Sequence, residues 1–312
     1  MSRVAAALAL LASFGLTACA ASREAATRAA NPPQGQFVTV GGTRLHVVVA
    51  GQGPDLVLIH GASGSGRDMT FDLLGRLSDR YRVIVPDRPG FGYSDALPGG
   101  GTLRQQADLL ADLAVELGAD RPLVVGHSYG GSVALAWAVH RPQNAAGLVT
   151  LAGASHPWDG DLSLFYRVTS SAVGRAVAVP AITALVPEGT VSGMVESVFA
   201  PQTEPEGYAE YFGPLMSASR KTLAANAQQR ATLSDELAVQ SRQYPVIDLP
   251  VEVLHGDADT TVGLEIHARP LSREVPGARL TVLPGVGHMP HHADPEAVVA
   301  VIDRAAARAG LR

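Results

Sequence analysis

The sequence predicts an α/β fold, namely a doubly wound, mostly parallel β-sheet into which a helical cap is inserted. Three observations indicate this architecture. Short, continuous apolar runs recur along the chain, as expected of strands that are buried on both faces. Segments with helical periodicity separate several of these runs, which favours parallel strands joined by helices. This alternation stops between residues 156 and 245, a stretch that is too long for a loop.

Eight segments have the composition of β-strands. Residues 37–40 and 43–49 flank Gly41-Gly42, which predicts an antiparallel hairpin at the edge of the sheet. The other six runs are residues 55–60, 82–86, 122–126, 145–151, 251–255 and 279–283. Apolar residues at helical spacing predict helices over residues 103–117, 132–140 and 295–307. We therefore assign residues 37–155 and 246–312 to one α/β core.

The region at 156–245 is predicted to be a helical cap. Its helical segments, separated by prolines, are residues 162–173, 191–199, 206–230 and 232–242. It contains half of the aromatic residues of the chain: Trp158, Phe165, Tyr166, Phe199, Tyr208, Tyr211, Phe212 and Tyr244. An apolar lid over the sheet explains this enrichment, and so does a small helical layer that needs aromatic residues for its own core. The two explanations are compatible.

The overall composition limits the function. The 312 residues are enough to bury a sizeable core. The formal net charge of −5 argues against nucleic acid as a partner, because nucleic-acid binding requires a basic surface. The single cysteine excludes an intramolecular disulfide and a zinc site built on several thiolates.

The N-terminal residues predict export. Residues 1–3 form a short basic start, residues 4–14 are almost wholly apolar, and Leu16-Thr17-Ala18-Cys19 follows. These four residues resemble the bacterial lipobox, in which a peptidase cuts before a cysteine that receives a lipid. The resemblance implies that residues 1–18 are removed as a signal peptide and that Cys19 anchors the protein to a membrane. A simple cleaved signal and an uncleaved transmembrane anchor are the alternatives.

The residues after Cys19 refine this prediction. Ala20 resembles the pattern of lipoproteins that are sent to the outer membrane, so we expect the protein to face the periplasm. Residues 19–36 are small and polar and end near Pro32-Pro33, which predicts a tether between the lipid and the folded domain.

One motif predicts a nucleophile. Gly126-His127-Ser128-Tyr129-Gly130 follows the apolar run at 122–126 and opens a helical segment, which is the strand–turn–helix setting of a G-x-S-x-G nucleophile elbow. Small residues on both sides of the serine let the strand and the helix approach each other. The alternative is a glycine-rich turn with an incidental serine, and the strand and helix around it argue against that.

A serine nucleophile needs a base, an orienting acid and an oxyanion hole. His288 follows the last predicted strand and is the candidate base. After the preceding strand, Asp259 is the first candidate for the acid and Asp257 the second. For the oxyanion hole we expect the backbone N–H groups of Tyr129 and Ala62, with Ser63 as the substitute for Ala62.

Five motifs in this order resemble the lidded α/β-hydrolase superfamily over residues 37–307. They are H-G-A-S-G at 60–64, D-R-P-G-F-G-Y-S at 87–94, G-H-S-Y-G-G at 126–131, H-G-D-A-D at 255–259 and G-V-G-H at 285–288. The resemblance implies that Asp259, at the second acid position, is the catalytic acid. Family members that are dehalogenases or epoxide hydrolases use aspartate as nucleophile, so Ser128 argues against both. Asp87 and Arg88 would belong to a loop at the active-site entrance, or would form only a structural turn.

Two other motifs are weaker. Residues 61–66 have the glycine spacing of a phosphate loop, but Arg67-Asp68 stands where such a loop has Lys-Ser or Lys-Thr. His288, His291 and His292 invite a metal interpretation, yet no carboxylate or cysteine completes a zinc motif in the sequence. We therefore expect no metal, with His291 and His292 facing solvent or the entrance. His60 and His127, on either side of the site, are expected to be packed and hydrogen-bonded.

These residues together predict a serine hydrolase that transfers an acyl group from a small carboxylic ester or a related compound, with no cofactor. Carbon–carbon bond hydrolases, perhydrolases and peptidases share the same catalytic residues and remain alternatives within this class. The alternative outside it is a non-catalytic, membrane-tethered binding protein that has kept the fold.

Overall fold

The computed structural model describes residues 3–312, and it describes the side chains from residue 15 onward. At its centre is an eight-stranded sheet of order β1-β2-β4-β3-β5-β6-β7-β8. The strands are β1 (Gln36–Val40), β2 (Thr43–Ala50), β3 (Asp55–Ile59), β4 (Arg82–Pro86), β5 (Leu123–His127), β6 (Gly147–Leu151), β7 (Val251–Gly256) and β8 (Arg279–Leu283). At one edge, β1 is antiparallel to β2, and β2 is antiparallel to β4. The remaining pairs, in the order β4, β3, β5, β6, β7 and β8, are all parallel. The predicted fold class is therefore confirmed.

Helices cover both faces of this sheet and close two apolar cores. On one face lie α4 (Leu103–Glu116), α5 (Tyr129–His140) and α11 (Ala268–Glu274); on the other lie α2 (Gly66–Thr70), α3 (Leu73–Leu77) and α13 (Pro295–Arg308). Trp137 of α5 is fully buried in the first core, and Leu73 of α3 in the second. Burial of such a side chain stabilises the fold by about 1.5–3 kcal/mol, so the sheet is a rigid platform for the loops at its edge.

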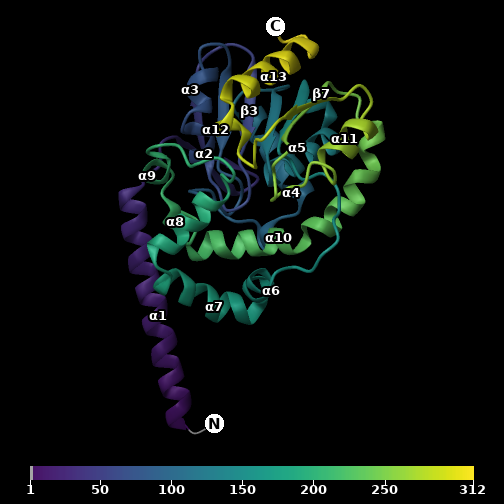
Figure 1. Cartoon of the computed structure of the whole chain (residues 1–312). Helices are drawn as coiled ribbons and strands as arrows, with labels where there is room; N and C mark the ends of the chain where they lie inside the picture. The colour runs from purple at the N-terminus through teal and green to yellow at the C-terminus, as the bar shows by residue number, and fades with distance from the viewer. Residues whose placement is uncertain (1–2) are drawn as a thin grey trace.

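A layer of helices lies between β6 and β7 in the chain, where the cap is predicted. It comprises α6 (Leu164–Ser170), α7 (Ala172–Leu185), α8 (Glu188–Ser197), α9 (Tyr208–Phe212) and α10 (Arg220–Gln240). In Figure 1, α10 runs across the molecule between the sheet and the pair α6–α7. Three details differ from the sequence prediction. The helix predicted over residues 206–230 is interrupted after Phe212, so α9 and α10 are separate helices. Helix α10 continues through the predicted break at residue 231, and α7 forms despite Pro180 within it.

Aromatic residues of the cap attach it to the core. Phe199, Tyr208 and Phe212 are buried together with Met289, which belongs to the α/β core. The Tyr208 and Phe212 rings are stacked, with centroids 5.3 Å apart. These contacts agree with the explanation that the helical layer needs aromatic residues for its core. That core, however, is shared with the α/β domain beneath the cap.

The N-terminal helix, α1 (Arg3–Ala30), differs from the predicted tether at residues 19–36. The segment is helical through Ala30 and lies beside α7 along the cap (Figure 1). Glu24 pairs with Arg220 at 2.7 Å, and Ala20 is fully buried. The alanine-rich sequence favours a helix, and these contacts hold it in place, so residues 19–30 form a packed helix within the segment where the sequence predicts a tether.

The predicted signal peptide lies largely outside the described side chains. The structure does not describe Met1 and Ser2, and it describes residues 3–14 only as backbone. Among residues 15–312, no single helix has the length and apolar composition needed to cross a membrane; only α6 and α7 taken as a pair do, with a bend of 109° between them.

Candidate active site

The turn between β5 and α5 holds Ser128 in a strained conformation. Its φ of 53° and ψ of −119° lie in a region that a non-glycine residue seldom adopts. The flanking glycines make the turn possible. A Cβ on Gly126 would lie 2.2 Å from the carbonyl oxygen of Gly130, and a Cβ on Gly130 would lie 2.3 Å from that of Ile59. The sequence therefore forces the serine out of the strand, as in a nucleophile elbow.

Three residues predicted from separate motifs meet at this turn. Ser128 Oγ lies 3.0 Å from His288 Nε2, and His288 Nδ1 lies 2.8 Å from Asp259 Oδ2. All three residues are buried, with exposures of 8%, 5% and 7% respectively. Since a carboxylate only accepts, His288 Nδ1 donates to Asp259, and this leaves Nε2 to accept the hydroxyl proton of Ser128.

Asp259 is held as an anion. Its Oδ1 accepts hydrogen bonds from the backbone N–H groups of Thr261 (2.8 Å) and Val262 (2.9 Å), and His255 Nε2 lies 3.2 Å from its Oδ2. Burial by itself would raise the pKa of Asp259, but the hydrogen bonds from His255, His288 and Val262 outweigh it and lower this pKa below its usual value. His255 was not among the predicted site residues, although it begins the motif H-G-D-A-D.

The second candidate for the acid has another role. Asp257 is exposed, and its Oδ1 accepts a hydrogen bond from the backbone N–H of Gly285 at 2.6 Å. It therefore supports the loop that leads to His288, whereas Asp259 is the carboxylate that contacts the imidazole.

The loop after β3 lies against the serine turn. A Cβ on Gly61 would lie 3.1 Å from Ser128 Cβ, so the loop approaches as closely as a glycine permits. Tyr129 is the first residue of α5, where backbone N–H groups have no acceptor within the helix. The N–H of Ser63, the substitute for Ala62, already donates to Asn226 Oδ1 at 3.1 Å. The geometry thus favours Ala62 over Ser63 as the partner of Tyr129.

Residues of the cap hold this loop. Asn226 of α10 accepts from Ser63 N, and its Nδ2 donates to Ser63 Oγ at 2.8 Å. Ser217 Oγ donates to the carbonyl oxygen of Ser63 at 2.5 Å. Position 63 has a positive φ of 55°, which is strained for a serine, and these three hydrogen bonds hold it there. The sequence offered no local signal for Asn226.

Arg88 lies fully buried behind the same loop. Its Nε donates to the carbonyl oxygen of His60 and its Nη2 to that of Gly61, both at 2.9 Å. The guanidinium also lies 4.4 Å from the centroid of the Tyr129 ring. Burial lowers the pKa of Arg88 to about 10, so the side chain is still a cation at neutral pH. Arg88 is therefore a buried support of the loop and does not line an exposed entrance.

In the segment that resembled a phosphate loop, the side-chain carboxylate of Asp87 stands where a phosphate would bind. Asp87 Oδ1 accepts the backbone N–H of Gly66 at 2.7 Å, at the beginning of α2. Its Oδ2 accepts from Tyr93 N and contacts His46 Nδ1, each at 2.8 Å. An anion therefore already occupies the position where a phosphate would be expected.

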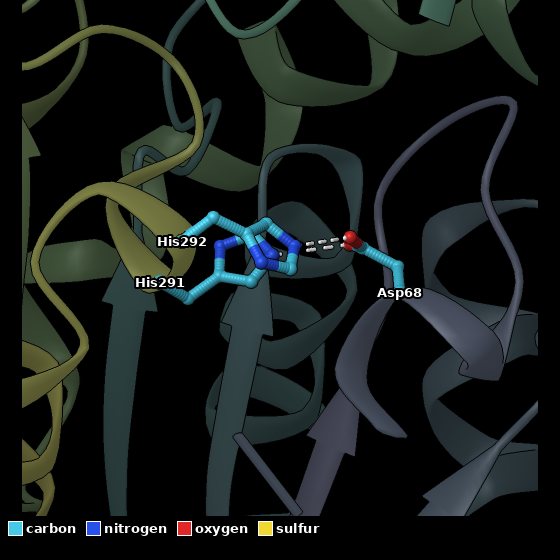
Figure 2. Close-up of side chains that lie close together, drawn as sticks. All are labelled: Asp68, His291 and His292. Carbon is cyan, nitrogen blue, oxygen red and sulfur yellow. Dashed lines mark hydrogen bonds and ion pairs between the residues drawn. The ribbon is translucent and has the colours of Figure 1, made fainter. Parts of the chain in front are cut away.

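The prediction for His291 and His292 was wrong. His291 is fully buried, and the side chain of His292 is 2% exposed. Both Nε2 atoms contact the carboxylate of Asp68, a residue more than 220 positions earlier in the chain (Figure 2). The carboxylate that the sequence motif lacked is thus supplied by α2. His60 and His127 are buried; His60 has hydrogen bonds through both ring nitrogens, whereas His127 bonds only through Nε2, to the carbonyl oxygen of His288.

Fold and site together define an α/β hydrolase, and comparison with known proteins agrees. The model of the alpha/beta hydrolase family matches residues 56–301, so the chain belongs to this family. A pimeloyl-[acyl-carrier protein] methyl ester esterase of Vibrio vulnificus is 29% identical over 270 residues, which are 81% of this chain and 94% of that enzyme. Haloalkane dehalogenase 2 of Mycobacterium tuberculosis is 27% identical over 268 residues, which are 83% of this chain and 90% of the dehalogenase.

A solved structure has the same architecture. An esterase of Thermogutta terrifontis, determined with malate bound, superposes with a TM-score of 0.70 at 26% identity, over 88% of this chain and 99% of the esterase. These relatives indicate that the protein is a hydrolase.

Proposed function

We propose that the protein is a serine hydrolase that cleaves carboxylic esters or related small acyl compounds through an acyl-enzyme. The hydrogen-bonded series Ser128–His288–Asp259 carries the proposal, because it combines a strained serine, an imidazole at 3.0 Å and a buried carboxylate at 2.8 Å. This is the geometry that a serine needs in order to become a nucleophile.

The reaction proceeds in two acyl transfers. Ser128 Oγ attacks the carbonyl carbon while its proton passes to His288 Nε2, and the carbonyl oxygen takes the electron pair of the broken π bond. When the tetrahedral intermediate collapses, the imidazolium returns the proton to the departing alkoxide. Water then attacks the acyl-enzyme with the same proton transfers, which releases the acid and restores Ser128. Asp259 holds the imidazole in position and stabilises its cationic form.

The oxyanion is stabilised by the N–H groups of Tyr129 and Ala62. The carbonyl of Gly61 and the N–H of Ala62 belong to one peptide group, and the oxygen of that group accepts from Arg88 Nη2 at 2.9 Å. A cation at the oxygen end polarises the N–H end and makes it a stronger donor. Arg88 is thus proposed as a positioning residue that acts through the peptide between Gly61 and Ala62.

Three alternatives differ from this proposal in the nucleophile, in the substrate or in the absence of catalysis. The resemblance to the superfamily implies an aspartate nucleophile for its dehalogenase members, whereas this chain has Ser128 in the elbow. Carbon–carbon bond hydrolases and perhydrolases share the serine, the histidine and the aspartate, and only the substrate distinguishes them. A binding protein without activity would have no use for the strained conformation of Ser128, which costs about 1–3 kcal/mol.

The test is turnover of an ester series of increasing acyl length by the wild type, Ser128→Ala and Ser78→Ala. Ser78 serves as the matched control because its Oγ bonds only the carbonyl oxygen of Gly75, away from the turn. We expect Ser128→Ala to lower turnover by about 10⁴-fold or more and Ser78→Ala to leave it unchanged. Absence of turnover by the wild type on every ester would favour the binding protein or another acyl substrate.

We also propose that the protein is exported and anchored through a lipid on Cys19, at an outer membrane that faces the periplasm. Support comes from the sequence Leu16-Thr17-Ala18-Cys19 after an apolar segment, and from the exposure of Cys19 in the structure. Metabolic labelling with a tagged fatty acid tests this proposal. The wild type should incorporate label and Cys19→Ser should not; equal labelling of both would overturn it.

A further inference from the structure

A buried cluster beside the proposed active site joins two separate segments of the chain. Asp68 belongs to α2, and His291 and His292 belong to α12 (Pro290–Ala293). Figure 2 shows both imidazoles pointing at the carboxylate of Asp68. His291 Nε2 lies 3.2 Å from Asp68 Oδ2, and His292 Nε2 lies 2.9 Å from Asp68 Oδ1.

We propose that Asp68, His291 and His292 bind a divalent transition-metal ion, with Zn²⁺ as the ion that suits these ligands best. Two imidazole nitrogens and one carboxylate oxygen are a donor set that zinc accepts. One ligand atom from each residue can be chosen so that all three lie within 4.8 Å of one another.

The spacing of the donor atoms supports a tetrahedral ion. With bonds of 2.0–2.1 Å, neighbouring ligand atoms in a tetrahedral zinc site are about 3.3 Å apart. The two contacts with Asp68, at 2.9 and 3.2 Å, join the imidazoles to different oxygens of the carboxylate, and each is within a few tenths of an ångström of this value. Tyr208 Oη, 2.8 Å from Asp68 Oδ1, is a further oxygen atom close to the proposed position of the ion.

The proton balance is also favourable. Without an ion, each Nε2 carries the proton that it donates to Asp68, and an ion must displace these two protons. The Nδ1 atoms of His291 and His292 are buried and have no hydrogen-bond partner within the part of the chain that the structure describes. Each Nδ1 can therefore take up the proton that its own Nε2 gives up. The site then changes from one negative charge to one positive charge without releasing a proton.

The charge state of the cluster suits this exchange. Asp68 is buried, and its carboxylate accepts hydrogen bonds from His291 Nε2, His292 Nε2 and Tyr208 Oη. These three donors stabilise the carboxylate as an anion, and a buried anion attracts a cation.

An ion at this position would fix the surroundings of the proposed base. Helix α12 begins two residues after His288, and α2 follows the loop that carries Ala62. His127 connects the two sites, since its ring centroid lies 4.5 Å from that of His291 and its Nε2 contacts the carbonyl oxygen of His288 at 2.9 Å. The effect on catalysis depends on the function proposed above, whereas binding of the ion does not.

Titration of the chelator-treated full chain with Co²⁺ and Zn²⁺ tests the proposal. We expect one ion per chain, visible absorption bands typical of four-coordinate Co²⁺ with N and O ligands, and a rise in Tm as Zn²⁺ is added. His292→Gln and Asp68→Asn should each weaken binding by about 10-fold or more. His140→Gln, which changes a histidine of α5 outside the cluster, is the matched control and should bind like the wild type.

Other outcomes would overturn the proposal. If the wild type binds Zn²⁺ no more tightly than Asp68→Asn, the cluster is only a hydrogen-bonded buried carboxylate. If His140→Gln weakens binding as much as His292→Gln, the ion is held elsewhere. Because the ion needs no nucleophile, Ser128→Ala should still bind it, and this separates failure of the metal site from failure of the proposed hydrolase.

Discussion

Arg88 donates a hydrogen bond from Nη2 to the carbonyl oxygen of Gly61 at 2.9 Å, on the peptide group whose N–H belongs to Ala62. All hydrogen-bond acceptors of this buried guanidinium are neutral oxygens. A buried cation without a carboxylate partner is costly, so its place behind the loop requires an explanation. Polarisation of the Ala62 N–H supplies one.

Substitution Arg88→Lys tests this role. Lysine keeps the charge but cannot donate to the carbonyl oxygens of His60 and Gly61 in the same geometry. We expect kcat to fall by about 10- to 100-fold while KM changes little, because the oxyanion forms only in the transition state. Steady-state kinetics, with urea unfolding to verify the fold, measure this effect. The exposed Arg104→Lys is the control, and a kcat within twofold of the wild type for Arg88→Lys would contradict the role.

The orienting acid is tested by a pair of substitutions. Asp259→Asn should lower kcat by about 10⁴-fold, because an amide no longer holds the His288 tautomer that accepts a proton. Asp257→Asn should change kcat by only a few-fold, since that side chain contacts Gly285 and not the imidazole. The opposite ranking of the two variants would show that the acid is Asp257.

Substitutions of Asn226 test whether the cap holds the loop that carries Ala62 and Ser63. Asn226→Ala removes two hydrogen bonds to Ser63, and we expect kcat to fall by about 10-fold because the loop loses its fixed orientation. Asn226→Asp keeps an acceptor for Ser63 N and for its hydroxyl, and it should restore most of the activity. If both variants match the wild type in kcat, the cap does not position the loop.

Stability should decrease in mild acid. Burial, aided by nearby Arg88, lowers the pKa of His60 from 6.5 to about 3, and burial lowers that of His267 from 6.5 to about 4. The unfolded chain protonates these imidazoles first, so their contribution is fully present above pH 6.5 and is lost as the pH falls toward 4. Each contributes about 1 kcal/mol per pH unit in this window. Urea midpoints should therefore be lower at about pH 5 than at about pH 7, and equal midpoints would contradict this.

Local patterns predicted the sheet well because each strand is an apolar run bounded by polar residues. The same patterns gave Ser128, Asp259 and His288, since each follows a predicted strand directly. They failed for α7, where Pro180 lies inside a helix that packs on α1 and α10. Tertiary contacts decide such an element, and local propensity does not.

The rest of the site depends on contacts between distant residues. Asp68 meets His291 across 223 positions of the chain, and Asn226 meets Ser63 across 163. No spacing rule in a sequence connects such pairs, because the fold alone brings them together. Arg88 and His255 were easier to associate with the site, because each belongs to a motif that is visible in the sequence. Their burial and their partners, however, became evident only in three dimensions.

Labelling with a fluorophosphonate probe, followed by intact mass and peptide mapping, tests the proposed nucleophile most directly. We predict one adduct per chain on the peptide that contains Ser128, formed by the wild type and by Ser78→Ala but not by Ser128→Ala. A folded wild-type chain that takes up no label, or one that is labelled at another residue, would contradict the assignment of Ser128 as an activated nucleophile.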